Sequence, residues 1–266
     1  MVTKKAGSAA KKTTRSNSQS KTNVTTVQSQ AARVSVPKFN LNSNELASTF
    51  ISEFVGVFVL VSAFLVTKGE PLYMGFVLVA LVMMVGTLSG SHLNPLISVG
   101  AWVTRRLSHL KTAVYLIAQF LGAGAAFVLM TTYLNGVQAD AAVFAQPARE
   151  VFALAPLTDQ NAWFIFFAEV LGASLFAFAF ASVYKASVDR VTRALTIGFG
   201  FFVAALVAGV VASYVGGQVA LNPASAVAAS AVDWTAVDWT AIAVYLAAPL
   251  LGGVIGFALR DAIETK

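Results

Sequence analysis

Two short stretches decide the fold of this chain: SHLNPLISVG at Ser91–Gly100 and VALNPASAVA at Val219–Ala228. Each places a Leu-Asn-Pro step among apolar residues. Asn is a favoured N-cap, and Pro suits the first helical position because its missing N–H would be unpaired there anyway. Each stretch therefore predicts the start of a short helix in surroundings as apolar as the interior of a membrane.

The composition predicts an integral membrane protein. Hydrophobic residues make up 57% of the chain and charged residues 11%, against about 25% charged in an ordinary soluble domain. The mean hydropathy is +0.74. Cysteine is absent and His92 and His109 are the only histidines, which excludes disulfides and thiol chemistry and makes a His-rich metal centre unexpected. We expect no cofactor, no metal and no catalytic residues, because no nucleophile–base pattern is visible.

The N-terminal segment differs from the rest. Residues 1–38 are rich in Ser, Thr, Gln and Lys and contain no acidic residue. This pattern predicts a disordered, basic cytoplasmic tail, whose boundary we place at 1–46. An alternative is a tail that binds anionic lipid, with an electrostatic attraction of about 1 kcal/mol for each basic residue near the membrane surface. A nucleic-acid partner is not expected, because no aromatic or folded element accompanies the charge.

Beyond the tail, six apolar segments are each close to the roughly 20 residues that a helix needs to cross a bilayer. They lie near 47–67, 72–91, 112–134, 161–184, 194–215 and 240–259. Two shorter segments, near 94–103 and 222–231, predict re-entrant half-helices. The predicted channel domain covers 47–260, in halves of about 47–134 and 161–260, and a short cytoplasmic C-terminus covers 261–266.

The basic residues predict the orientation in the membrane. If six helices alternate, Lys68 and Arg149 are the only Lys or Arg residues that fall on the outer side. The positive-inside rule then places both termini in the cytoplasm. Trp234 and Trp239, in the tandem VDWTAVDWTA on the outer side, are typical of interfacial anchors.

The chain reads as two copies of one plan. Glu-x-x-Gly occurs at Glu53 and Glu169, Leu-Asn-Pro occurs in both halves, and AVYLIAQFLGAGAAF from Ala113 aligns with AVYLAAPLLGGVIGF from Ala243. Each copy holds three spans and one half-helix. Because three is odd, the second copy is inverted relative to the first, and the functional site is expected at the midplane.

The two half-helices are expected to begin near one another at that midplane. Their N-termini each carry about half a positive charge, which repels cations. The amides of Asn94 and Asn222 offer N–H donors to a passing water. The predicted pore midplane consists of the two motif triplets: Asn94, Pro95, Leu96, Asn222, Pro223 and Ala224.

Glu53 and Glu169 are expected inside the membrane, where a carboxylate is costly. Three interpretations compete for each of them: a proton-coupling acid, a cation site or a structural acceptor of hydrogen bonds. Their matching positions favour acceptors for the irregular backbone that leads to each half-helix. Gln119 is expected to help in the same way.

These residues resemble the aquaporin (major intrinsic protein) family. The resemblance covers roughly residues 47–260 and rests on the paired Glu-x-x-Gly and Asn-Pro motifs, SGSHLNPLISVG and GGQVALNPAS. It implies an all-α membrane fold with six helices and two half-helices, a pore in each protomer, and a homotetramer. It also implies a passive channel for water in the cell membrane.

The chain departs from the family pattern at two places. The first Asn-Pro-Ala reads Asn-Pro-Leu, with Leu96 in place of alanine. Where the family usually has the arginine of the outer constriction, this chain has Ser225. The remaining filter positions map to Met74, Val219 and a residue between Val207 and Val210, with Val210 taken as the candidate. This filter is apolar, so it predicts either relaxed selection, with passage of small neutral solutes such as glycerol, urea or ammonia besides water, or a poorly wetted gate.

Two other functions remain open. A gated or non-conducting membrane scaffold would keep the same fold. A coupled secondary transporter also uses inverted repeats, but it would need charged groups at the midplane, where this chain has two neutral asparagines.

Overall fold

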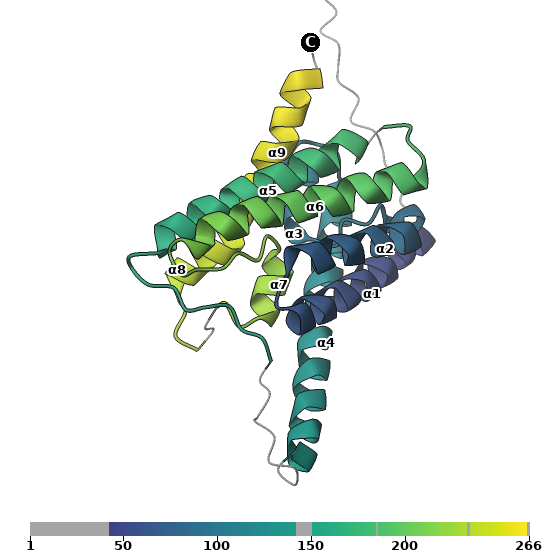
Figure 1. The fold of residues 1–266 in the computed structure, drawn as a ribbon. Coiled ribbons are helices and arrows are strands. Elements are labelled where there is room, and N and C mark those ends of the chain that lie inside the picture. The colour runs from purple at the N-terminus through teal and green to yellow at the C-terminus, as the bar shows by residue number, and fades with distance from the viewer. Residues whose placement is uncertain (1–42, 142–150, 185, 233–234, 265–266) are drawn as a thin grey trace, which may run out of the picture. The chain divides into compact units, whose positions relative to one another are not determined.

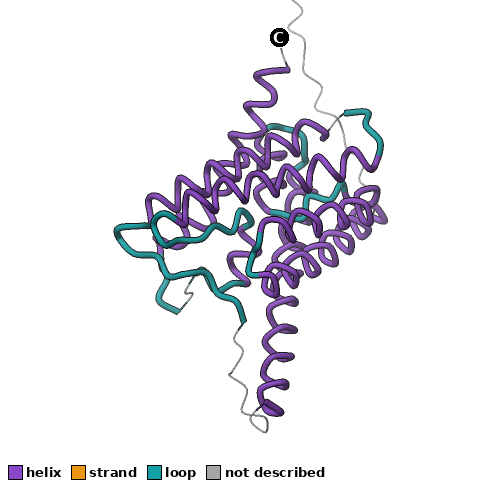
Figure 2. The backbone as a smooth tube through the Cα atoms, in the orientation of Figure 1, coloured by secondary structure: helices purple, strands orange, loops and turns teal. Residues whose placement is uncertain are grey.

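The structure is a computed structural model that describes residues 43–141, 151–184, 186–232 and 235–264. The chain divides into two units, residues 1–38 and 39–266, and all the described residues belong to the second. The predicted tail therefore lies outside the described residues except for residues 43–46. Trp234 of the tandem repeat also lies outside them. All the regular secondary structure of the described residues is helical (Figure 2).

Six helical spans among the described residues are long and apolar enough to cross a membrane. The first five contain α1 (Ser43–Thr67), α2 (Pro71–Ser89), α4 (His109–Ala141), α5 (Ala162–Tyr184) and α6 (Arg190–Ser213). The sixth is built from α8 (Trp239–Ile242), the π-helical turn η2 (Ala243–Ala247) and α9 (Ala248–Glu264). The six predicted spans are confirmed, with ends that shift by a few residues. The predicted domain limits at 46/47 and 260/261 fall inside α1 and α9, so both helices continue past the apolar segments.

The two short segments form α3 (Pro95–Val103) and α7 (Pro223–Ala228), which lie among the long helices (Figure 1). Asn94 and Asn222 are their N-caps, with extended backbone and a side-chain oxygen that accepts from the first turn. In both halves the preceding leucine has a left-handed backbone, with φ of 52° at Leu93 and 49° at Leu221. This conformation is uncommon for a non-glycine residue, and its recurrence reflects the repeat.

The long helices pack in matching pairs. α1 packs on α4, the equivalent α5 packs on α9, and α2 packs on α6. A Cβ added at Gly122 of α4 would lie 2.5 Å from the carbonyl oxygen of Phe54, and one at Gly252 of α9 would lie 2.6 Å from that of Val170. Glycine at these equivalent positions therefore lets the backbones of paired helices come together, as in other membrane helix bundles.

The last span is interrupted where the repeat is imperfect. The π-helical turn η2 ends two residues before Pro249, which occupies the position of Gln119 in the first half. Proline has no N–H to donate to the carbonyl of Tyr245, four residues earlier. This missing bond accounts for the loosened helical turn at that point.

Candidate functional site: a path between the two half-helices

The two motif asparagines connect the halves of the repeat. Asn94 Nδ2 donates to the carbonyl oxygen of Leu221 at 2.8 Å, and Asn222 Nδ2 donates to that of Leu93 at 3.2 Å. Each Oδ1 accepts from the first turn of its own half-helix, Leu96 N at 3.0 Å and Ala224 N at 3.0 Å. An amide NH2 carries two hydrogens, so each asparagine retains a second donor beyond the bond that ties the two half-helices together.

The two glutamates bind the backbone that leads into the half-helices. Glu53 accepts from His92 N at 3.0 Å and from Leu93 N at 2.7 Å, and also from Ser89 Oγ and Gln119 Nε2. All these groups are buried. The carboxylate therefore supplies acceptors to N–H groups that have no helical partner and no water.

Glu169 accepts hydrogen bonds from the backbone before the second half-helix in the same way, but it has fewer partners than Glu53. It is fully buried and accepts from Ala220 N at 2.6 Å and Leu221 N at 3.0 Å. The position equivalent to Gln119 is Pro249, which has no side-chain donor. Within the described residues, no group of three His, Cys, Asp or Glu side chains could hold a metal ion.

Three cavities among the described residues share lining residues and so lie in series. We call them the basic vestibule, the central chamber and the Val219 vestibule. Their volumes are about 290, about 10 and about 180 Å³. His92 lines both the basic vestibule and the central chamber. Phe64, Phe201 and Ala220 line both the central chamber and the Val219 vestibule.

The central chamber is the smallest of the three. A volume of about 10 Å³ holds roughly one water molecule. Its polar groups are the two motif asparagines, His92 and Ser225, and the rest of its wall is apolar or backbone. The full lining is Leu60, Phe64, Met74, Leu78, His92, Leu93, Asn94, Phe176, Phe201, Ala220, Asn222 and Ser225.

The structure brings most of the predicted filter residues to this path. Met74 and Ser225 line the central chamber, and Val219 lines the next vestibule. Val210 does not join them: it is 46% exposed and lines none of the three cavities. From α6, the central chamber and the Val219 vestibule are lined by Phe201, Ala205, Gly209 and Ser213, each about one helical turn from the next. Gly209, inside the expected interval 207–210, therefore lies on the lining face in place of Val210.

Leu96 is fully buried but does not line the central chamber. The position of a Cβ on Gly253 of α9 lies 3.3 Å from the Cβ of Leu96 and 2.4 Å from its carbonyl oxygen. Leu96 therefore sits against α9. Pro95, Pro223 and Ala224 are also buried without lining the chamber.

Sequence reasoning missed the aromatic wall of the chamber. Phe64, Phe176 and Phe201 come from α1, α5 and α6, and no motif marks them among the 20 phenylalanines of the chain. The rings of Phe176 and Phe201 meet edge to face at a centroid distance of 5.1 Å, a favourable geometry for aromatic pairs.

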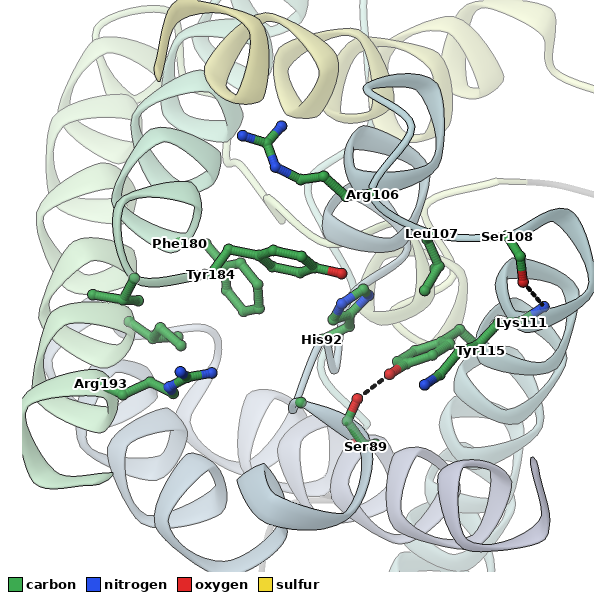
Figure 3. A pocket seen from close by; sticks show the side chains of 13 residues that line it. Ser89, His92, Arg106, Leu107, Ser108, Lys111, Tyr115, Phe180, Tyr184 and Arg193 are labelled. Atoms are coloured by element: carbon green, nitrogen blue, oxygen red, sulfur yellow. Dashed lines mark hydrogen bonds between the residues drawn. The ribbon is translucent and has the colours of Figure 1, made fainter. Parts of the chain in front are cut away.

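The basic vestibule opens on the other side of His92. Figure 3 shows Arg193 and Tyr184 reaching toward His92 from one side, with Tyr115 and Lys111 on the other and Arg106 above. The ring of His92 lies against Tyr115, at 4.3 Å between centroids, and its Nδ1 lies 3.1 Å from Ser98 Oγ. His92 is therefore held in place where the vestibule meets the chamber.

The rim of this vestibule is fixed by ion pairs and a helix cap. Arg106 binds Asp261 of α9 and lies 5.1 Å from the ring centroid of Phe257. Asp189 caps α6 and accepts from the backbone N–H groups of Val191 and Thr192. A hydrogen bond from the Thr192 hydroxyl is the largest cause that lowers the pKa of Asp189, so this cap is charged at neutral pH.

Comparison with known proteins agrees with this geometry. The profile of the family described as "Major intrinsic protein" matches residues 40–259. Aquaporin-B of Dictyostelium discoideum is 31% identical over 162 residues, which is 58% of this chain and 53% of that protein. Aquaporin AqpM of Methanothermobacter marburgensis is 29% identical over 102 residues, 38% of each chain. The chain thus matches about half or less of the length of these relatives.

A solved structure shares the fold. The aquaglyceroporin from Plasmodium falciparum superposes with a TM-score of 0.60 at 18% identity, over 83% of this chain and 96% of that one. At this identity the likeness shows the all-helical fold alone. The family profile, which matches most of the chain, shows that this multi-pass membrane protein belongs to the major intrinsic protein family.

Proposed function

We propose that this protein is a passive channel that lets water cross a membrane along the three cavities in series. The observation that carries the proposal is the central chamber, where Asn94 and Asn222 from opposed half-helices line a space of about one water. Each asparagine has a donor left for a water oxygen after tying the halves together. A water passing here exchanges hydrogen bonds with fixed partners.

The size of the chamber favours water over larger neutral solutes. Ammonia is close to water in size and fits the same space. Glycerol and urea are larger, and their passage needs the side chains that line the chamber to move apart. Ser225, whose hydroxyl stands where the family usually has an arginine, leaves the constriction uncharged, so selection rests on its width and its apolar wall.

We assign structural roles to the carboxylates. Glu53 and Glu169 each accept backbone N–H groups of the segment before a half-helix. Neither lines any of the three cavities. These bonds favour the acceptor interpretation over a coupled transporter, which would place such groups on the solute path. The two half-helix N-termini at the chamber oppose the entry of cations.

A gated channel is the second candidate, and the narrow chamber favours it. Aromatic and aliphatic walls around a space of about 10 Å³ are typical of a constriction that closes by losing its water. A non-conducting scaffold would show the same chamber permanently closed. Water flux separates these cases.

The remaining assignments complete the proposal. We assign this vestibule and both termini to the cytoplasmic side, an assignment that the excess of Lys and Arg on that side supports. We assign the protein to the plasma membrane as a homotetramer, and the basic residues 1–38 to the cytoplasmic surface.

The test is osmotic shrinkage of liposomes that contain the purified protein, followed by light scattering. We expect faster shrinkage than in empty liposomes. Met74→Trp should slow it strongly, because the larger ring fills the chamber. Val210→Trp is the matched control, since it adds the same ring on the exposed face of α6. Equal flux through both variants would contradict the assigned path, and no flux through the unmodified protein would favour the closed or scaffold candidates.

A further inference from the structure

The basic vestibule has an uneven charge. Three cationic side chains line it, Arg106 from the loop after α3, Lys111 from α4 and Arg193 from α6. The other lining residues are Ser89, Gly90, His92, Leu107, Ser108, Tyr115, Phe180, Val183, Tyr184 and Ile197. No Asp or Glu side chain is among them. The wall therefore offers positive charge and hydroxyl groups but no carboxylate to receive a cation.

Arg193 is the cation with the most free hydrogen-bonding capacity. Within the described residues its guanidinium donates to the carbonyl oxygen of Ala186 at 3.4 Å, a long bond. A guanidinium has five N–H donors. In Figure 3 its head group points into the cavity, toward His92 and Tyr184.

Arg106 contributes a second feature. Its side chain is 6% exposed, and the outer nitrogens of its guanidinium bind Asp261. Its Nε is buried and has no hydrogen-bond partner among the described residues. An unpaired buried donor is costly, and an acceptor in the vestibule would satisfy it.

Lys111 stands nearer the rim. Its Nζ binds Glu45 at 2.8 Å, and the two side chains are 21% and 49% exposed. Asp261 and Glu45 thus offset two of the three cations from outside the cavity lining. The charge of Arg193 has no carboxylate partner among the described ion pairs, and the charged Asp189 at the rim accepts from the backbone of the first turn of α6, so the Arg193 guanidinium stays available to an anion.

We propose that the basic vestibule binds a small phosphate-type oxyanion, held mainly by Arg193 with help from Arg106 Nε and the Tyr184 hydroxyl. Guanidinium groups match the tetrahedral oxygens of phosphate well. The cavity of about 290 Å³ has the volume of about ten waters in the liquid, which accommodates a phosphate with part of its hydration shell. The ligand is either free phosphate or the phosphomonoester of a lipid headgroup.

The position of this site gives binding a consequence. His92 lines both the vestibule and the central chamber, so an anion on Arg193 stands at the exit of the water path. Occupancy is expected to slow water flux, an effect that rests on the channel function proposed above. The binding itself does not depend on that function, so it can be measured separately.

The first measurement is binding by the purified full-length protein. The melting temperature is recorded in sodium phosphate and in sodium chloride of equal ionic strength, at a slightly alkaline pH where the phosphate dianion dominates. Phosphate is expected to raise the melting temperature in a saturable way. Arg193→Gln should weaken the apparent affinity at least about tenfold, as expected for loss of a charge-assisted bond. Arg193→Lys should keep part of the affinity.

Arg190→Gln is the matched control, because Arg190 is an exposed cation three residues earlier on the same helix and does not line the vestibule. This variant should respond to phosphate as the unmodified protein does. The melting temperature of each variant in chloride shows whether it folds. An equal phosphate response of folded Arg193→Gln and Arg190→Gln would overturn the proposal, as would no response of the unmodified protein.

The second measurement is the ratio of water flux in phosphate to that in chloride. A flux ratio well below one for the unmodified protein, which rises toward one in Arg193→Gln, supports the site. Liposomes with phosphatidic acid and no free phosphate identify the source: Arg193-dependent slowing there indicates a lipid headgroup, and slowing only with free phosphate indicates the soluble anion. A ratio of one, with flux well above that of empty liposomes, contradicts the block and leaves the channel function intact. No flux in any buffer contradicts the channel function, and the melting temperatures then decide on the site.

Discussion

Replacing Glu169 by glutamine tests whether this buried carboxylate is a structural acceptor. One of its oxygens accepts from Ala220 N at 2.6 Å and the other from Leu221 N at 3.0 Å. Glutamine has nearly the same shape but offers one oxygen and one NH2 group. With the glutamine oxygen kept on Ala220 N, the N–H of Leu221 faces a donor and retains only a long bond of 3.4 Å to that oxygen.

The cost follows from the burial of these groups. A buried donor left unpaired costs about 1–3 kcal/mol. For a chain of this size, each kcal/mol moves the melting temperature by about 2–4 °C, so Glu169→Gln should melt about 2–12 °C below the unmodified protein. Because Leu221 leads into Asn222, the variant should also pass water more slowly.

The assay is thermal unfolding in detergent together with liposome shrinkage. Glu264→Gln serves as the control: it removes a carboxylate of an exposed i, i+4 pair with Arg260, which contributes little. An unchanged melting temperature for Glu169→Gln, together with loss of a proton-gradient dependence of flux that the unmodified protein shows, would refute the structural reasoning and favour a coupling role.

Three further predictions concern the path and its frame. Ser225→Arg should reduce water flux, because a guanidinium does not fit a chamber of about 10 Å³; unchanged flux would place Ser225 away from the path. Phe201→Ala should let glycerol re-swell shrunken liposomes, since it removes one aromatic wall; continued exclusion of glycerol would mean that Met74 or Phe176 sets the width. Gly122→Val and Gly252→Val should each lower the melting temperature, because a Cβ would lie 2.5 or 2.6 Å from a backbone oxygen of the paired helix; a stability equal to that of Gly124→Val, at a glycine with open space, would contradict the close packing.

The spans and half-helices could be predicted because they depend on local features. An apolar segment of sufficient length has one stable conformation in a bilayer, the helix, since every backbone group must be paired. The Asn-Pro steps mark helix starts by their own chemistry, as the caps at Asn94 and Asn222 show. The order of motifs in the two halves then determined the inverted arrangement.

The filter could not be predicted fully because it depends on how far each helix is rotated. The expected position on α6 lay between Val207 and Val210, with Val210 as the candidate, whereas the central chamber and the Val219 vestibule are lined by Phe201, Ala205, Gly209 and Ser213. The long connection from Tyr214 to Leu221 separates the register of α6 from that of α7, so a fixed spacing fails. Met74, the candidate reached by counting back from Asn94, lines the central chamber. Only Gly90–Leu93 separate its helix α2 from the Asn94 cap of α3.

The basic vestibule was also beyond sequence reasoning. Arg106, Lys111 and Arg193 were informative only as charges that orient the chain. They line one cavity only because the loop after α3, the start of α4 and the start of α6 come together around His92. This arrangement depends on the tertiary fold and leaves no mark in the local sequence.

The central claim is that water crosses between the two asparagines. The most direct measurement is the osmotic shrinkage rate of liposomes with and without the protein at several temperatures. The account predicts that liposomes with the protein shrink faster than empty liposomes and that their shrinkage rate depends less on temperature. Met74→Trp should abolish both effects, and Val210→Trp should keep them. Shrinkage no faster than in empty liposomes, or equally fast in both tryptophan variants, would contradict it.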